Sequence, residues 1–432
     1  SLLTLDTVFS GASGIQAAGG EVGWAAGFQI RRETYKVDPF VQNDLDINPG
    51  PSGNGPFSFL AGLNSADEDQ TIYAIFGELQ IPLYDDIDVQ VAVRYEDYGG
   101  DIGSTFDPKV AAKWQINDFF ALRGSAQTSF RGPTLNQTTG RFTTLQFIAP
   151  TSAFKAVDTF SNPDLNPESA FSFNVGGIFE NDDGLYVSVD YYNFDFSDPI
   201  IVEDHNPIVD AAIAALATAT TDDDGILNRV EFNDPLNPSA TTISRVITNI
   251  TNGPDIKTSG IDLRIEKSWN IGSSQITAGT DATYMLEYEV GDFGIEDIII
   301  AGGDRVGQFN RSNFSRSLPQ WKANFYLNYN WDAPWGNNNL RAVVRHVDSY
   351  KDERGDTTPL NNRDDSTLDA MTTVDLYYLA ELPHQFELGL SVANVFDEDP
   401  PYAQFDTNYD PYTHSPFGRT FKVSLRKSFS GL

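Results

Sequence analysis

Apolar and polar residues alternate along most of this chain with a period of two. In the stretch 418–429, Phe421, Val423 and Leu425 fall on one face, and charged or small polar residues fall on the other. Lys427 is the exception on the apolar face. Because successive side chains of a strand point to opposite sides of a sheet, the pattern predicts strands with one apolar and one polar face.

The same pattern predicts about fourteen strands, joined alternately by short turns and long polar loops. This arrangement is typical of an all-β fold, a transmembrane antiparallel β-barrel, with the short turns in the periplasm and the long loops outside the cell. We expect residues 1–21 to be a lead-in segment and residues 22–432 to form the barrel. The expected strands are 22–34, 70–81, 87–98, 107–116, 119–131, 168–180, 185–197, 259–269, 274–288, 319–331, 339–350, 372–381, 385–396 and 418–429.

A soluble β-sandwich would show the same alternation in any single strand. Long strands with fully charged polar faces, between tight turns and long loops, favour the barrel. One loop is expected to hold a helix, because apolar residues in 207–218 have helical spacing. Aromatic residues near strand ends are predicted to form the interfacial girdles: Trp24, Tyr98, Trp269, Trp331 and Tyr350.

Composition narrows the possible functions. The 432 residues carry a formal net charge of −33 and include no Cys. A chain this acidic would repel phosphates, so we expect no nucleic-acid partner. The lack of Cys excludes a disulfide framework and a Cys-ligated metal site. No stretch approaches the ~20 apolar residues of a membrane-spanning helix. We expect no signal peptide within the first residues, which have neither a basic region nor a long apolar core.

Four short motifs lie on the expected strands in a consistent order. Phe130–Thr134 is similar to Phe-Arg-Ala-Pro-Ser/Thr, and Asn162–Glu168 is similar to Asn-Pro-x-Leu-x-Pro-Glu. Val392–Asp397 contains Asn-Val-Phe-Asp, and Gly418–Phe421 begins the last strand. Together they resemble the barrel of TonB-dependent outer-membrane receptors over roughly residues 20–430. The motif or lumen residues singled out are Arg131, Pro133, Asn162, Pro163, Glu168 and Arg419, and Phe421 and Phe429 resemble the signal for the barrel assembly machinery.

The resemblance implies a barrel of about 22 strands in the bacterial outer membrane, in contact with lipid and lipopolysaccharide. It also implies an N-terminal plug that contacts the TonB complex. The chain would then be a C-terminal portion, and the plug and first strands would come from the same precursor or from a separate chain. Its implied function is energy-coupled uptake of a scarce nutrient, whose chemical class the motifs do not indicate.

Two other functions stay open. One is a passive pore or lipid-type channel of about fourteen strands, and the other is a surface structural or assembly protein. We expect no enzyme activity, because the chain has four His and neither a Gly-x-Ser-x-Gly nor a His-Glu-x-x-His motif.

Candidate binding residues lie in the loops and the lumen. The aromatic residues of the last loop either stack on a ligand or pack the loop; they are Tyr402, Phe405, Tyr409 and Tyr412. The spacing of Asp222, Asp224 and Glu231 has a weak likeness to a Ca²⁺ loop, although a solvated acidic extracellular loop is the favoured explanation. No other cofactor is expected. Arginines on the polar strand faces are expected to neutralise lumenal carboxylates such as Glu96, Asp262 and Glu266.

Overall fold

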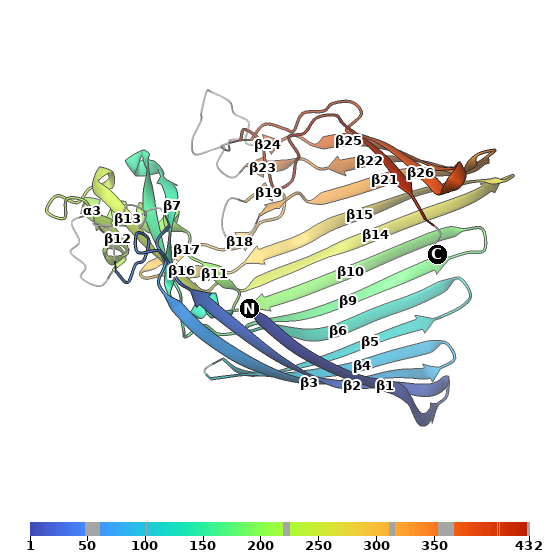
Figure 1. Ribbon diagram of the computed structural model, residues 1–432, viewed down its shortest axis with the longest axis horizontal. Coiled ribbons are helices and arrows are strands. Elements are labelled where there is room, and N and C mark those ends of the chain that lie inside the picture. The colour runs from blue at the N-terminus through green and yellow to red at the C-terminus, as the bar shows by residue number, and fades with distance from the viewer. Residues whose placement is uncertain are drawn as a thin grey trace.

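The structure, a computed structural model, describes residues 1–47, 61–100, 102–218, 225–310, 316–352, 367–403, 405 and 407–429. One antiparallel sheet of sixteen strands, the barrel wall, dominates it (Figure 1). Its strands in order are β1 (Leu2–Ala17), β2 (Gly20–Val37), β3 (Ala66–Tyr84), β4 (Ile87–Gly99), β5 (Gly103–Gln115), β6 (Phe120–Arg131), β9 (Glu168–Glu180), β10 (Leu185–Ser197), β14 (Ile256–Ile271), β15 (Ser274–Val290), β21 (Trp321–Ala333), β22 (Gly336–Val347), β25 (Met371–Leu382), β26 (Phe386–Ala393) and β27 (Thr420–Lys427), with β18 (Gly303–Asp304) paired to β15.

The wall begins one strand earlier than the alternation indicated. Residues 1–21, expected as a lead-in segment, contain β1, which pairs with β2 along its whole length. The adjacent apolar pairs Leu2–Leu3 and Val8–Phe9 interrupt the period of two, and the register shifts between Ala12 and Gln16. These irregularities hide the strand from a search for alternation. At the other end β27 stops at Lys427, so Phe429 follows the strand.

The two faces of the wall differ in polarity as the alternation predicts. Apolar side chains on one face are exposed to the surroundings; Ile75, Leu327 and Leu425 are 61%, 51% and 66% exposed. Charged residues such as Arg94 and Glu96 alternate with them and face the lumen. Short turns gather at one end of the strands and long loops at the other (Figure 1). We call the long-loop end the extracellular mouth, following the general rule for such barrels.

Two of the aromatic residues expected at the membrane interfaces lie elsewhere. Tyr98 is buried on the lumenal side, and Tyr350 is buried beneath loops at the mouth. A Tyr near a strand end can point to either face, and the loops that cover Tyr350 come from distant parts of the chain. Trp24 and Trp269 are exposed, as a girdle position requires.

The barrel wall of this chain is an open arc. β1 and β27 are the two ends of the strand order, and among the described residues no register pair joins them. Each of these strands therefore leaves one edge without a strand partner. Unpaired backbone N–H and C=O groups are costly in a hydrocarbon environment.

Beyond the mouth, segments that follow β6, β10 and β15 fold together into a loop module (Figure 1). In its sheet β13 pairs with β8 in parallel, although the two strands are distant in sequence. The helix α3 (His205–Thr218) covers this sheet, and the expected helix is confirmed. The other elements are β7 (Arg141–Ile148), η1 (Ala149–Thr151), β8 (Ala153–Phe160), β11 (Ile200–Val202), η2 (Ile226–Arg229), β12 (Val230–Phe232), η3 (Ala240–Thr242), β13 (Ile243–Asn252), β16 (Phe293–Ile295) and β17 (Ile298–Ile300).

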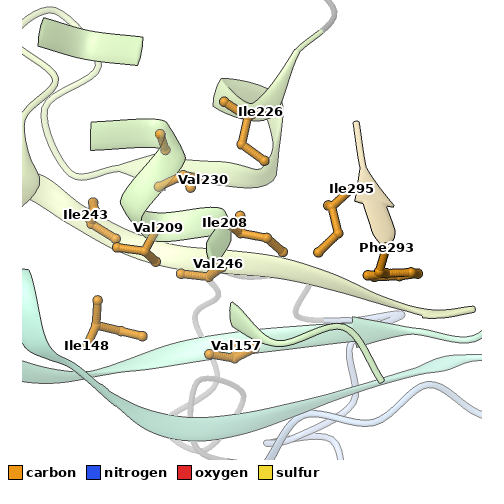
Figure 2. Close-up of a cluster of buried hydrophobic side chains, with 11 residues drawn as sticks. Ile148, Val157, Ile208, Val209, Ile226, Val230, Ile243, Val246, Phe293 and Ile295 are labelled. Carbon is orange, nitrogen blue, oxygen red and sulfur yellow. The ribbon is translucent and has the colours of Figure 1, made fainter. Parts of the chain in front are cut away.

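The loop module has a hydrophobic core of its own (Figure 2). Ile208 and Val209 of α3 pack against Val246 of β13, and β16 adds Phe293 and Ile295 from a third loop. Complete burial of such side chains supplies the main driving force for folding in water. The core therefore joins three loops that are far apart in the sequence.

A smaller sheet covers the mouth near the C-terminal strands. It consists of β19 (Gln308–Phe309), β20 (Ser317–Leu318), β23 (Tyr350–Asp352) and β24 (Thr367–Leu368). Two short helical turns complete the described elements, α2 (Leu135–Thr138) and η4 (Pro383–Gln385). Within the described part of the chain, no helix combines the length and the apolar character needed to span a membrane.

Candidate functional site

The lumenal face of the wall carries a series of ion pairs. Arg94 Nε donates to Glu96 Oε1 at 2.6 Å, and Arg123 Nη2 donates to Asp190 Oδ2 at 2.6 Å. Asp262, expected to neutralise an arginine, instead accepts a hydrogen bond from Thr283. The pairing removes most of the net charge that these arginines would present to a solute. The pairs are Arg31–Glu33, Arg94–Glu96, Arg123–Asp190, Arg131–Glu168, Arg264–Glu266 and Arg345–Asp375.

Two motifs singled out in the sequence meet at the mouth. Arg131 ends β6 and Glu168 begins β9, and the two residues are register partners joined by an ion pair. Glu168 also accepts the backbone N–H of Ile200 at 2.6 Å. Gly132 lies against the ring of Tyr98, where an added Cβ would approach the ring to 2.5 Å. The motif therefore fixes the direction in which the chain leaves β6. The chain returns to the wall at β9, the strand that pairs with β6.

The second motif anchors the base of the loop module. The side chain of Asn162 accepts the N–H of Asp164 at 2.9 Å, and Pro163 lies within this turn. The turn places Leu165 in a small apolar cluster with Ile200. Pro133, at the other motif, is buried. These residues shape the connection between the wall and the module.

Two buried arginines connect the strands and loops of the module. Arg245 of β13 binds Asp158 of β8, and its Nη2 lies 2.7 Å from Asp158 Oδ1. Arg229 binds Glu203 and also Glu296, whose Oε1 lies 2.8 Å from Arg229 Nη1. Removal of one member of such a buried pair leaves the other charge without compensation, which is strongly destabilising. The two clusters therefore hold three loops in one arrangement.

The aromatic residues of the last loop pack mainly against each other and the small mouth sheet. Phe405 lies 5.6 Å from the ring of Phe309, and it meets Tyr412 edge-on at 6.2 Å. The guanidinium of Arg316 lies 4.6 Å from the Tyr412 ring. Tyr402 and Tyr409 form an isolated β-bridge. These contacts account for the packing of the loop, and a ligand role of the four aromatic residues stays a prediction.

A polar cluster lies under the same loop. Tyr350 donates its hydroxyl hydrogen to Asp410 Oδ2 at 2.7 Å. Burial raises the pKa of Tyr350, and the Asp410 carboxylate raises it further. Burial lowers the pKa of His414, whose ring stacks on Tyr350 with 6.0 Å between centroids. Among the described residues, His414 Nε2 is buried and has no hydrogen-bond partner. Burial in this cluster therefore favours the neutral form of the His414 imidazole.

Comparison with known proteins identifies the fold family. A family model described as TonB dependent receptor-like, beta-barrel, matches residues 3–395. The chain belongs to this family. Its membership places the chain in the outer membrane of Gram-negative bacteria. The family and the structural relatives below are receptors and transporters.

Relatives of known structure share the fold of this TonB-dependent barrel. The siderophore receptor PirA from Acinetobacter baumannii aligns with a TM-score of 0.64 and 17% identity, over 99% of this chain and 55% of that chain. The ferric enterobactin receptor PfeA from Pseudomonas aeruginosa aligns with a TM-score of 0.64 and 17% identity, over 99% and 54%. The chain thus spans about half the length of these receptors.

Curated relatives match shorter stretches. The probable TonB-dependent siderophore receptor PirA of Acinetobacter baumannii is 24% identical over 156 residues, which is 36% of this chain and 20% of that protein. The iron-regulated outer membrane virulence protein of Vibrio cholerae is 26% identical over 104 residues, which is 24% of this chain and 15% of that protein.

In the described part of this TonB-dependent barrel, no group of three or more His, Asp or Glu side chains is arranged to hold a metal ion. Asp222 and Asp224 lie outside the described residues. Glu231 lies in β12, where burial raises the pKa of its carboxyl group and Oε2 has no described hydrogen-bond partner. Arg419 lies beside Asp397, with 3.8 Å between Nη2 and Oδ2. Phe421 and Phe429 are exposed, so contact with lipid or with an assembly partner is sterically open to them.

Sequence reasoning did not find the residues that organise the loops. Arg245, Asp158 and Arg229 lie in polar loop sequence that shows no motif, and their partners are far away along the chain. The β13 stretch is rich in Ile, but the adjacent apolar residues Val246 and Ile247 interrupt the alternation, so this stretch shows no clear strand signal.

Proposed function

We propose that the chain forms the ligand-collecting barrel of an energy-coupled nutrient receptor. The support is the combination of the family match over 3–395 with a wall whose mouth carries a separately folded loop module. A passive porin needs an open lumen, whereas a receptor needs a structure that captures its ligand outside. The module is too large and too well packed to be a simple connection between strands.

The proposal includes further strands and a plug. The unpaired edges of β1 and β27 support additional strands, because the wall must close in lipid. The charged lumenal face supports a polar occupant such as a plug domain, which would contact the TonB complex from the periplasm. Outer-membrane lipid and lipopolysaccharide would surround the apolar face, and the barrel assembly machinery would insert the wall.

A ferric siderophore is the first substrate class to test, because the relatives named above are siderophore receptors. The test uses a Gram-negative strain that lacks its own ferric siderophore receptors and expresses this protein. We expect iron to accumulate from at least one ferric siderophore, and we expect accumulation to stop in a matched strain without functional TonB.

The passive-pore alternative gives a different result. A pore would admit small solutes equally in both strains, and the purified protein would conduct ions steadily in planar bilayers. Equal uptake together with a steady open conductance would overturn the receptor proposal.

A further inference from the structure

A pocket of about 600 Å³ lies in the loop module, next to its hydrophobic core. Its floor is the face of the module sheet that α3 covers only in part. Val157 and Val246 are neighbours across β8 and β13 and lie in the core with α3. Thr159 and Thr248 are the next neighbours on the same face, and they line the pocket. The volume falls within the range of small-molecule sites, about 300–1,000 Å³.

The ionisable side chains of the pocket are the carboxylates of Glu203 and Asp204 and the imidazole of His205, whose Nδ1 lies 3.6 Å from Asp204 Oδ1 and whose pKa is lowered by burial. Among its described lining residues, none is Lys or Arg. The Glu203 carboxylate is engaged by Arg229 and by the N–H of Asn249 at 2.7 Å. Asp204 accepts the N–H of Asn206 at 3.0 Å in the first turn of α3. The buried Arg245–Asp158 pair lies on the opposite face of the sheet, because its residues alternate with those of the pocket.

The rest of the lining consists of neutral hydrogen-bonding residues and apolar residues in equal number. Thr159 and Thr248 bond to each other at 3.0 Å on the buried floor. Thr144 stands beside them, and the exposed Gln146 forms part of the rim. Hydroxyl and amide groups both donate and accept hydrogen bonds, and Phe142 adds an apolar ring.

We propose that this pocket binds a neutral, polyhydroxylated ligand, a saccharide. The lining matches such a ligand in three ways: its hydroxyl and amide groups can both donate and accept hydrogen bonds, one wall is apolar, and none of its described residues is Lys or Arg. An anionic metal chelate would meet the Asp204 carboxylate, and no Lys or Arg among the described lining residues would offset its charge. The proposal rests on the proposed function, in which the module collects a ligand outside the cell, and it names the ligand class for one pocket of that module.

Two sources supply a ligand of this class: free oligosaccharides and the glycan of lipopolysaccharide. The test measures binding to the purified full protein by titration calorimetry. The probes are neutral disaccharides (maltose, lactose and cellobiose), the polysaccharide released from lipopolysaccharide, and a ferric tris-catecholate complex as the anionic comparator. We expect binding of a disaccharide or of the released polysaccharide, and the responding probe identifies the source.

The decisive variant is Thr144→Val with Gln146→Leu, which removes two hydrogen-bonding groups at half-exposed and exposed positions. It should weaken saccharide binding about tenfold, because each hydrogen bond contributes roughly 0.5–1.5 kcal/mol. Gln275→Leu at the periplasmic turn is the matched control, since Gln275 is also exposed but lies at the other end of the wall. Thr144→Trp fills the pocket and should abolish binding. Circular dichroism and protease resistance of the module show whether each variant folds.

The proposal is overturned if no neutral probe binds, if the double variant of a folded module binds as well as the control, or if the catecholate complex binds and loses affinity in the double variant. Uptake by cells is a separate readout. Loss of transport with saccharide binding intact would count against the receptor proposal alone, and loss of binding with transport intact would count against the pocket alone.

Discussion

The barrel wall and the loop module follow different rules within one chain. Every cluster of buried apolar side chains found among the described residues lies at the mouth or in the module. The wall instead turns Leu327 and Leu425 outward and holds ion pairs such as Arg94–Glu96 on the inner face. The difference shows that the wall is built for lipid outside and a polar lumen inside, whereas the module is built as a small water-soluble domain.

The same difference appears in the ion pairs. On the wall, Arg345 remains half exposed beside Asp375, and Arg32 and Asp69 are both more than half exposed. In the module, the side chains of Arg245 and Asp158 are 2% and 4% exposed. An exposed pair is weakened by water and salt, whereas a buried pair leaves an isolated charge when one partner is lost. The comparison therefore predicts large effects in the module and small ones for the exposed ion pairs of the wall, such as Arg32–Asp69.

The largest effect is expected for Arg245→Met. The substitution leaves Asp158 buried without its cation, so the module should lose roughly 3–5 kcal/mol of stability. Hydrogen exchange measures this loss directly: amides of β8 and β13 should exchange much faster, while those of the wall strands keep their protection.

The matched control is the double variant Arg245→Met with Asp158→Leu. It removes both charges and leaves no isolated ion, so most of the protection should return. If the single and double variants lose protection equally, the pair acts through its shape and not through its charge. Electrostatics would then not explain the difference between the wall and the module.

A smaller effect, set by pH, is expected at His414. Burial depresses its pKa, Lys322 acts in the same direction, and Asp410 opposes both. Burial acts to raise the pKa of Asp410, but hydrogen bonds from the Tyr350 hydroxyl and the Tyr412 backbone N–H outweigh it and keep this pKa below the ordinary value, so Asp410 stays ionised at mildly acidic pH. A buried histidine with a depressed pKa favours the neutral form. The packing of the last loop should therefore be most stable above pH ~6.5, the unfolded value, and weaken as pH falls through the lower folded value.

Hydrogen exchange of the last loop at pH 7.5 and at pH 5.5, corrected for intrinsic rates, tests this dependence. His414→Phe keeps a ring beside Tyr350 but cannot titrate, so its corrected protection should not change between the two pH values. An unchanged pH response in that variant would assign the effect to another group.

The strands of the wall could be predicted from the sequence because each strand shows its own alternation of apolar and polar residues. Lipid on one side and a polar lumen on the other force an alternation that needs no knowledge of distant residues. The strand β1 was not predicted, because Leu2–Leu3 and Val8–Phe9 interrupt the period of two. It is recognised only from its pairing with β2. Arg131 and Glu168 were singled out separately, and their ion pair became visible only in the structure.

The loop module could not be predicted in the same way. Its central pairing joins Val157 to Val246 in parallel, across a long stretch that returns to the wall in between. No local period encodes such a contact, because the core forms only when three loops meet. Only α3 had a local signal, since Val209 and Ala212 follow helical spacing. The pocket beside the core could not be predicted for the same reason, because its residues come from three separate segments of the chain.

The smallest effect is expected for Arg32→Gln at the extracellular end of β2. Arg32 Nη2 lies 3.2 Å from Asp69 Oδ2, and the two side chains are 58% and 52% exposed. Water and salt screen such a pair, so its loss should change the stability of the wall by about 0.5 kcal/mol or less. A double-mutant cycle with Asp69→Asn isolates the pair from other effects of the substitutions. A coupling well above ~1 kcal/mol would mean that this pair lies in a less polar environment than its exposure indicates. The headgroup layer of the membrane would then screen an ion pair as weakly as the interior of the module does, and less than open water does.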